Sequence, residues 1–429
     1  MNKAQAIIFG VIGVVVLIAV LIITGVLPGL KERTPASFTL VIWGSRDKPE
    51  LWRTVADAYR TQEVESATIE YVKKDPGTYE AELLNALAAG RGPDIFLLSD
   101  PELERHRDKI APLDEGLFGY RKRDLKNIFA DGAIDVISDA SGSLFGTPLS
   151  FDTLALFFNR DHLNAANIPA PPGTWEELVE RASVLTKLSS VGGIQHSGIA
   201  LGTASNVEHA GDILAALMYQ SGGRFVDSAS GRSAIVSPAS ASAVALYTSF
   251  ADTTRRSYSW NAFFASSLRA FADGETSMAI GYAADVPTVA AVNPQLNFDV
   301  ALFPQPVQAQ TPITVGRLEI ATVSRNSNEQ EQAWRFLLWL QSKDVQKTYS
   351  DAVGLPSPRR DLVNSKPPQE YLTPFYDQVL RARALPVVLG GSLRDTLTDI
   401  IDGVTTRRFS IDAALSHAEG EINKSLETQ

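Results

Sequence analysis

Two alternating patterns of apolar residues fill the N-terminal part of the chain. Runs rich in β-branched and aromatic residues at 38–43, 67–72 and 90–98 predict short strands. Between them, apolar residues recur three and four positions apart over 49–61 and 76–89, which is the spacing of one face of a helix. The resulting strand–helix–strand–helix–strand order predicts a doubly wound α/β sheet.

The same alternation of strand and helix continues in the middle of the chain. Residues 154–158 form an apolar run of strand length with little alternation, as expected of a strand buried on both faces. Gly146 and Pro148 predict a turn shortly before it. Thr174, followed three positions later by Glu177, predicts a helix N-cap with a capping box. Strand, linker and capped helix make one further α/β wind.

The remaining elements follow from the same criteria. Helices are predicted at 175–188, 211–219, 240–251, 263–272, 329–342, 371–383, 393–404 and 411–425. Strands are predicted at 197–201, 278–280 and 298–303. The α/β character therefore extends to the end of the chain.

An uncharged apolar run at 7–27 precedes the first strand. A helix rises about 1.5 Å per residue, so a run of this length can cross a hydrocarbon core of about 30 Å. Its length, and the absence of an Ala-x-Ala cleavage site after it, favour an uncleaved anchor over a cleaved signal peptide. We therefore predict an N-terminal transmembrane anchor at 1–30 and a short polar linker at 31–37.

Length, charge and composition limit the class of protein. The chain has 429 residues, enough for two domains, and its formal net charge of -10 argues against a general nucleic-acid groove. The absence of cysteine excludes disulfides, thiolate metal sites, a cysteine nucleophile and a lipid-modified cysteine anchor. The five histidines show no metal-ligand spacing. We therefore expect neither a metal nor a cofactor.

Several short motifs of different residue types lie along the chain. The central ones are Gly146-x-Pro148, Phe158-Asn159, Asp161, Pro171-Pro172 and the Thr-Trp-Glu-Glu-Leu run at 174–178. The outer ones are the Gly-Arg-Gly-Pro-Asp segment at 90–94, the Phe-x-x-Gly pattern at 271–281 and the Gly-Leu-Pro turn at 354–356. Together they resemble bacterial extracellular solute-binding proteins of the maltose-binding-like class, which serve ABC sugar transporters. Arg317 and Leu318 depart from the small residues usual in one ligand-side loop of that family.

The resemblance implies a two-lobed, type II periplasmic-binding-protein-like α/β fold. Lobe 1 would contain 38–147 and 300–345, and lobe 2 would contain 148–299 and 354–429. Hinges are expected near 146–149, 300–303 and 345–354. A solute would bind between the lobes, which would close over it as a hinge.

Candidate ligand-binding residues come from two arguments. Open α/β sheets bind ligands beyond the carboxyl ends of their strands, a rule that selects Trp43, Asp47, Asp100 and Tyr282. The resemblance adds Phe151, Asp152 and Trp260 as residues near the crossover and in the second lobe. Aromatic rings suit the apolar faces of sugars, and acids and amides suit their hydroxyls.

Asn206 joins the set for its amide, and Arg317 joins it because Arg46 or Arg317 could hold a charged solute. Each aromatic residue could instead pack in the core, and Asp47 and Asp152 could instead cap helices or lie in solvent.

Two enzyme classes share fragments of this pattern. Ser45-x-x-Lys48 matches the first motif of penicillin-binding enzymes, but the companion Ser-Asp-Asn and Lys-Thr-Gly motifs are missing. Asp47 and Asp152 could imitate the carboxylate pair of a glycosidase, although the sequence does not fix their separation. No P-loop, dinucleotide fingerprint or Gly-x-Ser-x-Gly motif occurs. We therefore predict a protein that is not an enzyme.

The combined prediction is a membrane-tethered, monomeric solute-binding protein outside the cytoplasm. It would capture a small polar solute, with carbohydrate as the default, and deliver it to the transmembrane subunits of an ABC permease. The alternatives are a ligand sensor or scaffold of the same fold and, less favoured, a glycan-acting hydrolase.

Overall fold

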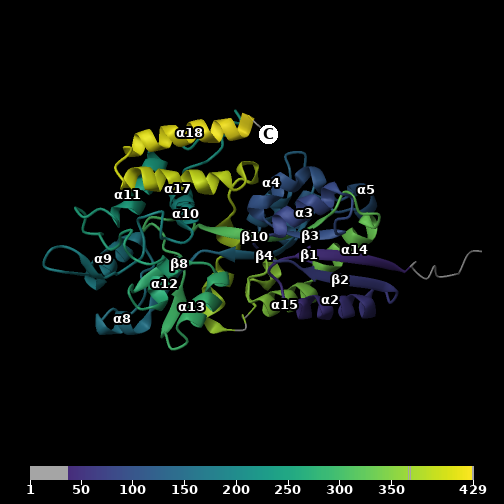
Figure 1. Cartoon of the computed structure of the whole chain (residues 1–429), viewed down its shortest axis with the longest axis horizontal. Coiled ribbons are helices and arrows are strands. Elements are labelled where there is room, and N and C mark those ends of the chain that lie inside the picture. The colour runs from purple at the N-terminus through teal and green to yellow at the C-terminus, as the bar shows by residue number, and fades with distance from the viewer. Residues whose placement is uncertain (1–36, 366, 368, 428–429) are drawn as a thin grey trace, which may run out of the picture.

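The structure is a computed structural model that describes residues 37–365, 367 and 369–427 (Figure 1). The predicted membrane anchor lies outside these residues. Among the helices that the structure describes, none is both long enough and apolar enough to cross a bilayer.

The first lobe is built on a six-stranded sheet in the order β11-β10-β3-β1-β2, with β4 paired to β10. Its strands are β1 (Phe38–Gly44), β2 (Ala67–Lys73), β3 (Ile95–Ser99), β4 (Thr147–Thr153), β10 (Thr314–Val323) and β11 (Ala382–Arg383). β1 pairs in parallel with both β2 and β3, and helices α2 (Pro49–Gln62) and α3 (Tyr79–Ala88) connect the three strands. The predicted βαβαβ order is therefore confirmed.

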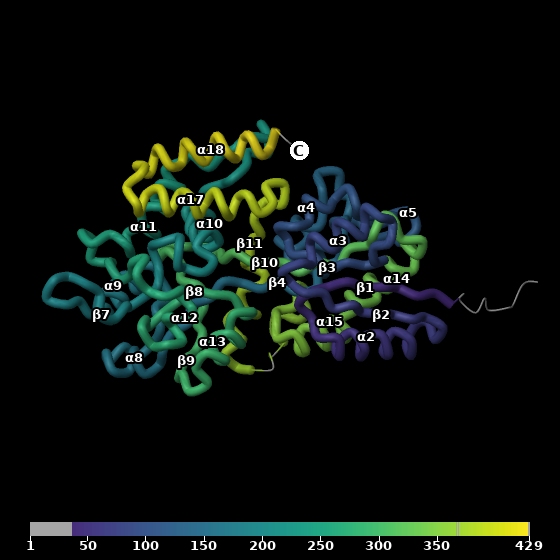
Figure 2. Tube along the Cα trace, viewed as in Figure 1, coloured from purple at the N-terminus to yellow at the C-terminus, as the bar shows by residue number. Residues whose placement is uncertain are grey.

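Strands β4 and β10 form an antiparallel pair at the junction of the two lobes, and Figure 2 shows them with β11 between the two halves. The turn predicted at Gly146–Pro148 is wrong, because Pro148 lies within β4 and pairs with Ile320 at a register shift. Proline is compatible with this position because β4 pairs only with β10 among the described strands, which leaves it at a sheet edge. The ligand-side loop expected at Arg317 and Leu318 is also wrong, since both residues lie within β10.

The second lobe contains a small antiparallel sheet in the order β8-β5-β9. Its strands are β5 (Ala155–Asn159), β8 (Met278–Gly281) and β9 (Phe298–Ala301). Helices surround the sheet: α8 (Arg160–Ala165), α9 (Trp175–Leu185), α10 (Ala210–Gln220), α11 (Pro238–Ser249), α12 (Ser267–Ala272) and α13 (Val286–Val292). In Figure 1, α17 (Ser392–Thr405) and α18 (Ile411–Glu427) stack beside α10 and α11.

Local signals in the second lobe are confirmed at one site and wrong at another. The Thr174 hydroxyl accepts the backbone N–H of Glu177 at 3.2 Å, so the predicted N-cap of α9 is confirmed. The strand predicted at 197–201 is wrong: only Ser197 makes an isolated bridge, and the regular strand β7 (Ile194–His196) ends before it.

Two large apolar cores lie on either side of the strand pair β4–β10, which we call the crossing strands. One contains Trp52, Leu97 and Phe336 from α2, β3 and α14 (Gln330–Leu340). The other contains Ile213 and Leu397 from α10 and α17. Each lobe thus buries its own core, as expected of two domains.

The chain between the two cores is irregular near its C-terminal end. The helix predicted at 371–383 is wrong, because only α16 (Thr373–Asp377) is α-helical there and Ala382 and Arg383 pair with β10. Residues 345–354, predicted as a hinge, lie almost entirely in α15 (Lys343–Val353), and Val345 packs in the first core.

Candidate functional site

Arg317 and Glu319 are the two residues of β10 that are only partly buried. They lie two positions apart, so their side chains project from the same face of the strand. Glu319 lies opposite Ser99 of β3 and Ser150 of β4, and Arg317 lies opposite Asp152. The charged face of β10 therefore adjoins the carboxyl ends of β3 and β4, where α/β sheets place ligands.

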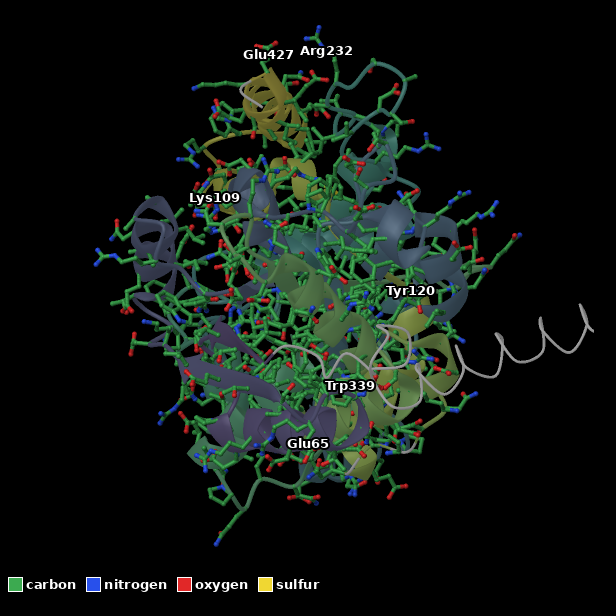
Figure 3. The ribbon with its side chains drawn as sticks, turned by 90° about the vertical axis from the view of Figure 1, so that its right-hand side faces the viewer. Glu65, Lys109, Tyr120, Arg232, Trp339 and Glu427 are labelled. Atoms are coloured by element: carbon green, nitrogen blue, oxygen red, sulfur yellow. The ribbon has the colours of Figure 1, made fainter. Side chains whose placement is uncertain are left out.

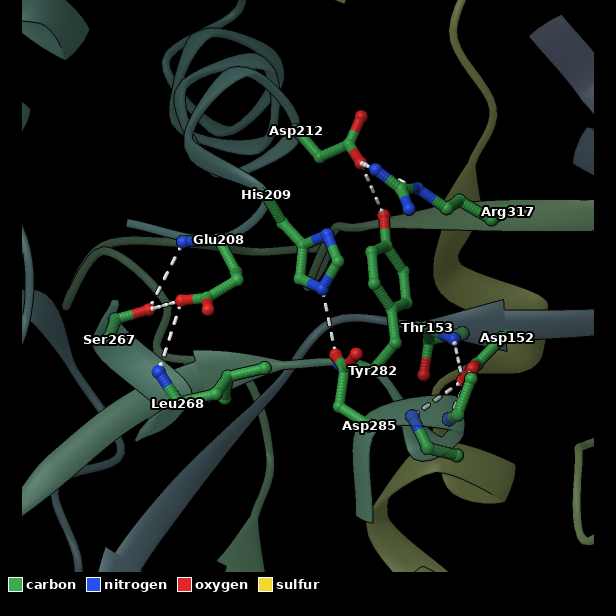
Figure 4. A network of polar contacts seen from close by, with 12 residues as sticks. Asp152, Thr153, Glu208, His209, Asp212, Ser267, Leu268, Tyr282, Asp285 and Arg317 are labelled. Carbon is green, nitrogen blue, oxygen red and sulfur yellow. Dashed lines mark hydrogen bonds and ion pairs between the residues drawn. The ribbon is translucent and has the colours of Figure 1, made fainter. Parts of the chain in front are cut away.

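Asp212, in the first turn of α10, anchors a buried ionic network. Its carboxylate accepts from Arg317 Nε at 2.8 Å, Arg394 Nε at 2.7 Å and the Tyr282 hydroxyl at 3.0 Å. Figure 4 shows Asp212 facing Tyr282 and Arg317. Burial raises the pKa of Asp212, but the positive charges of Arg394 and Arg317 outweigh it and hold the pKa below its ordinary value. Asp212 is therefore ionised.

Arg394, in α17, connects this network to the first lobe. Its Nη2 lies 3.1 Å from Asp100 Oδ2, directly after β3, and Asp100 Oδ1 accepts the backbone N–H of Leu318 at 3.3 Å. Asp100 is 2% exposed, and burial raises its pKa. Arg394 is thus shared between Asp100 of one lobe and Asp212 of the other. Two guanidinium groups balance two carboxylates, which is the condition under which buried charges are tolerated.

Tyr282 lies at the centre of the second-lobe part of the network. The guanidinium of Arg317 lies 4.8 Å from its ring centre, and the ring of His209 meets it edge-on at 4.8 Å. Asp285 accepts the Tyr282 backbone N–H at 2.7 Å and lies 2.8 Å from His209 Nε2. Tyr282 is 2% exposed, and its hydroxyl is committed to Asp212.

Glu319 pairs with Arg46 of the first lobe at 3.0 Å. Burial raises the pKa of Glu319 to about 8, because Arg46, which is 68% exposed, only partly offsets the desolvation of the carboxylate. Asp47 is held inside the lobe, where Oδ2 accepts from the Trp52 indole and the Tyr349 hydroxyl, each at 2.9 Å. Burial raises the pKa of Asp47, and these two hydrogen bonds oppose that shift.

Trp43 is the partly exposed aromatic ring at the end of β1. Lys74 Nζ lies 3.7 Å from its ring centre and also bonds Glu82 at 3.0 Å. The Trp43 ring therefore acts as a cation–π platform, which the Lys74 ammonium covers in this structure.

Asp152 and Phe151 both lie on β4, and both are buried. Asp152 accepts three backbone N–H groups, from Thr153 at 2.8 Å, Ala283 at 3.0 Å and Ala284 at 2.9 Å. Figure 4 shows this carboxylate against the chain that follows Tyr282. Burial nevertheless raises the pKa of Asp152 to about 7. The residue fastens the start of the 3-10 turn before α13 to the crossing strand.

Asn206 and Trp260 contact each other in the second lobe. The Trp260 indole donates to Asn206 Oδ1 at 3.1 Å, and the Asn206 amide donates to the backbone of Asn261 and Phe264. Trp260 is 0% exposed and stacks on Phe264 with ring centres 4.4 Å apart. In this structure both side chains hold a loop in the second core.

The structure therefore brings Asp100, Tyr282 and Arg317 into one network, while Trp43 and Asp47 lie nearby at the end of β1. Sequence reasoning missed Asp212 and Arg394 altogether. Asp212 carries a signal that could have identified it, since it is a lone charge within the apolar stretch of α10. Arg394 carries none, because a basic residue near the start of a polar-faced helix is ordinary.

In α/β folds, the ends of the strands and the junction between domains are the usual places for small-ligand sites. The family model for bacterial extracellular solute-binding proteins matches residues 54–373, so the chain belongs to this family. Binding proteins of Brucella abortus and Brucella suis are each 24% identical over 355 residues, which cover 80% of this chain and 82% of theirs.

Solved structures share the fold over almost the whole chain. The cyclic alpha-maltosyl-1,6-maltose binding protein of Arthrobacter globiformis has a TM-score of 0.77 at 19% identity, covering 92% of this chain and 100% of its own. The sugar-binding protein MalE of Xanthomonas citri has a TM-score of 0.73 at 18% identity, covering 91% and 98%. UgpB of Mycobacterium tuberculosis, solved in complex with glycerophosphocholine, has a TM-score of 0.71 at 16% identity, covering 92% and 100%.

Proposed function

We propose that this protein captures a small polar solute, by preference a carbohydrate, between its two lobes and delivers it to an ABC permease. The observation that carries the proposal is the family match over 54–373, joined to a junction where charged groups of both lobes meet beside the end of β3. The sugar-binding proteins that share the fold support carbohydrate as the solute class.

The solute would contact the partly exposed side chains at the lobe junction. Trp43 would stack on a sugar face after Lys74 moves aside, and Arg46 and Arg317 would donate to hydroxyl oxygens. The buried members Asp100, Asp212 and Arg394 would position Arg317 rather than bind solute. The other predicted ligand residues, Asp47, Phe151, Asp152, Asn206, Trp260 and Tyr282, would support the site or be reached after the lobes move.

Closure would bend the chain where it passes between the cores. The hinges expected from sequence near 146–149 and 300–303 lie inside the lobes, because Leu149 packs in the first core and Phe303 in the second. We place the bend instead between Phe151 of the first core and Leu154 of the second, and between Val315 of the second core and Leu318 of the first. The pairing of β4 with β10 and the two separate cores support such a hinge. Without solute, the ion pairs of Arg394 would be the bridge between Asp100 of the first lobe and Asp212 of the second.

The N-terminal segment at 7–27 would anchor the protein on the outer side of the cell membrane. Its apolar length supports an anchor, and the family's extracellular character supports the outward placement. Tethering would hold the binder near its permease at a high effective concentration. The family relationship also supports a binder rather than an enzyme.

Contacts within the site argue against the hydrolase alternative. Asp47 accepts from two side chains, and Asp152 accepts three backbone N–H groups, so both carboxylates already hold the structure together. A glycosidase needs one carboxylic acid free to protonate the leaving group and a second free to act on the sugar or a water.

A thermal-shift screen of the purified chain tests the proposal. The panel contains mono- and oligosaccharides, polyols, sugar phosphates and amino acids. A solute present at a hundred times its dissociation constant adds about 2.7 kcal/mol to the stability of the folded protein, which raises Tm. We expect one sugar to raise Tm in the wild type and to lose this effect in Trp43→Ala.

Trp339→Ala is the matched control for this screen. Trp339 lies on α14 in the first lobe, bonds Gln62 at 3.3 Å, and is seen near Glu65 in Figure 3. It should retain the full shift. A folded wild type that responds to no solute, or a response that survives Trp43→Ala, would contradict the proposed site.

A further inference from the structure

A cavity of about 540 Å³ lies at the sheet edge formed by β11, separate from the network around Asp212. Its walls come from α7 (Asp131–Ile137), the end of α10, the loop before β10 and the segment 380–387. The volume lies within the range of small-molecule sites, about 300–1,000 Å³. None of the residues that line it belongs to the charged network described above.

The walls contain side chains from both lobes. Val136 belongs to the first core and Leu385 to the second, while Ala382 lies on the strand paired with β10. Because the two cores would move relative to each other when the lobes close, the shape of this cavity depends on the angle between them.

Several contacts fix the shape of the walls. The Tyr219 hydroxyl donates to the Ala384 carbonyl at 3.1 Å across the cavity wall. Gly132 lies so close to β11 that a Cβ atom there would meet the Ala382 carbonyl oxygen at 2.6 Å. Part of the cavity wall is therefore tightly packed backbone.

Two acids and two arginines line the cavity, and both arginines are exposed to solvent. Asp131 pairs with Arg360 at 2.9 Å, and Asp135 pairs with Lys126 at 2.8 Å, so both acids have basic partners outside the cavity. Arg381 and Arg383 line the cavity and, among the described residues, have no acidic partner. Arg383 stacks over the Tyr219 ring, with its guanidinium carbon 5.3 Å from the ring centre.

The apolar part of the wall complements these two arginines. Leu380, Leu385 and Pro386 line the cavity beside them, and Leu380 is 45% exposed. Guanidinium groups bind carboxylates and phosphates through paired donors, and an apolar wall accepts a hydrocarbon or ring.

We infer that this cavity is a second ligand site, which binds a small organic anion with an apolar body. Arg381 and Arg383 hold the carboxylate or phosphate, and Leu380, Leu385 and Pro386 cover the apolar part. Because both lobes line the cavity, an occupied site favours one lobe angle and changes the affinity for solute at the lobe junction. This coupling rests on the proposed function, whereas binding of the anion does not.

Calorimetric titration of the full chain tests the binding step without any sugar. The probes are phenyl phosphate and benzoate, which distinguish a phosphate from a carboxylate, with benzyl alcohol as the neutral analogue. We expect saturable binding of at least one anion and none of benzyl alcohol. Arg381→Gln and Arg383→Gln should each weaken binding about tenfold, as loss of a charged hydrogen bond does.

Arg256→Gln is the control, because Arg256 is an exposed arginine outside the cavity. It should bind the anion like the wild type. An absence of saturable binding by both anions, equal binding of benzyl alcohol, or unchanged affinity in both cavity variants would overturn the site.

The coupling is tested by titrating the sugar found by thermal shift with and without a saturating anion. A change in sugar affinity of twofold or more in the wild type, absent in Arg383→Gln, supports coupling. Anion binding with unchanged sugar affinity would overturn the coupling and keep the site. Anion binding with no sugar response at all would instead count against the proposed function.

Discussion

Arg394 forms ion pairs with two buried carboxylates, those of Asp100 and Asp212. It is shared by Asp212 Oδ1 at 2.7 Å and Asp100 Oδ2 at 3.1 Å, and both carboxylates are nearly inaccessible. Replacing it by a neutral residue of similar length would leave Asp100 without its ion-pair partner, while Asp212 would keep Arg317 and the Tyr282 hydroxyl.

We predict that Arg394→Met lowers the free energy of unfolding by about 3–5 kcal/mol, the usual effect of removing one member of a buried ion pair. Urea unfolding measures it. Arg335→Met is the control, since Arg335 pairs with Glu331 in an exposed i,i+4 pair worth about 0.3–0.5 kcal/mol. A loss in Arg394→Met no larger than in the control would show that the network does not stabilise the fold.

Glu319 makes stability depend on pH. Its pKa in the folded protein is about 8, above the ordinary value of 4.5, so folding favours the protonated form. This contribution is complete below about pH 4.5 and is lost as the pH rises towards 8. We predict that the wild type loses stability relative to Glu319→Gln between about pH 5 and about pH 8.5, as urea unfolding measures.

Glu331→Gln, which removes an exposed carboxylate, should follow the wild type at both pH values. Asp152, whose pKa of about 7 falls in the same window, is present in all three proteins and cancels in the comparison. An equal loss of stability with pH in the wild type and Glu319→Gln would refute the raised pKa of Glu319.

At this scale the sequence predicts where polar groups lie but not how they pair. Asp100, Tyr282 and Arg317 were selected because they follow strands or suit a polar solute, and they do share one network. Their partner Arg394 is separated from Asp100 by 294 residues. Packing of α17 against α10 brings Arg394 to Asp212, and contacts between the turns at 387–389 and 100–102 bring it to Asp100. No local pattern records that packing.

At the scale of elements, the crossing pair β4–β10 determines how the lobes are joined. Gly316 lies in β10 where a Cβ atom would meet the Phe151 ring at 2.5 Å and the Asp152 carbonyl at 3.0 Å. The close approach of the two strands therefore requires a residue without a side chain at this position.

We predict that Gly316→Ala lowers the free energy of unfolding by about 1–3 kcal/mol, as overpacking does. Gly420→Ala is the opposite control, because Gly420 lies on α18 with no atom within 4 Å of the added Cβ. It should raise the free energy of unfolding by about 0.5–1 kcal/mol. A neutral Gly316→Ala in urea unfolding would mean that the strands can separate without cost.

Elements with strong periodicity could be predicted from sequence, and elements at the lobe junction could not. The strands and helices of 38–98 and the N-cap at Thr174 match because their signals are local. The sequence did not predict β4, because it contains Pro148, or β11, because it has only two residues. Both strands are formed by pairing with β10. Long-range pairing overrides local propensity at this junction.

At the scale of the whole molecule, two cores, a crossing strand pair and one shared arginine form a structure suited to hinge motion. The family relationship establishes the class of protein, and the residues at the junction support the solute site. In the function proposed here, solute binding and lobe closure are the same event.

Small-angle X-ray scattering of the chain from residue 37 onward tests this claim most directly. The radius of gyration is measured across the same solute panel, for the wild type and Trp43→Ala. We predict that the sugar which raises Tm also lowers the radius of gyration of the wild type and leaves that of Trp43→Ala unchanged. A sugar that raises Tm without changing the radius of gyration, or that compacts both proteins equally, would contradict the account.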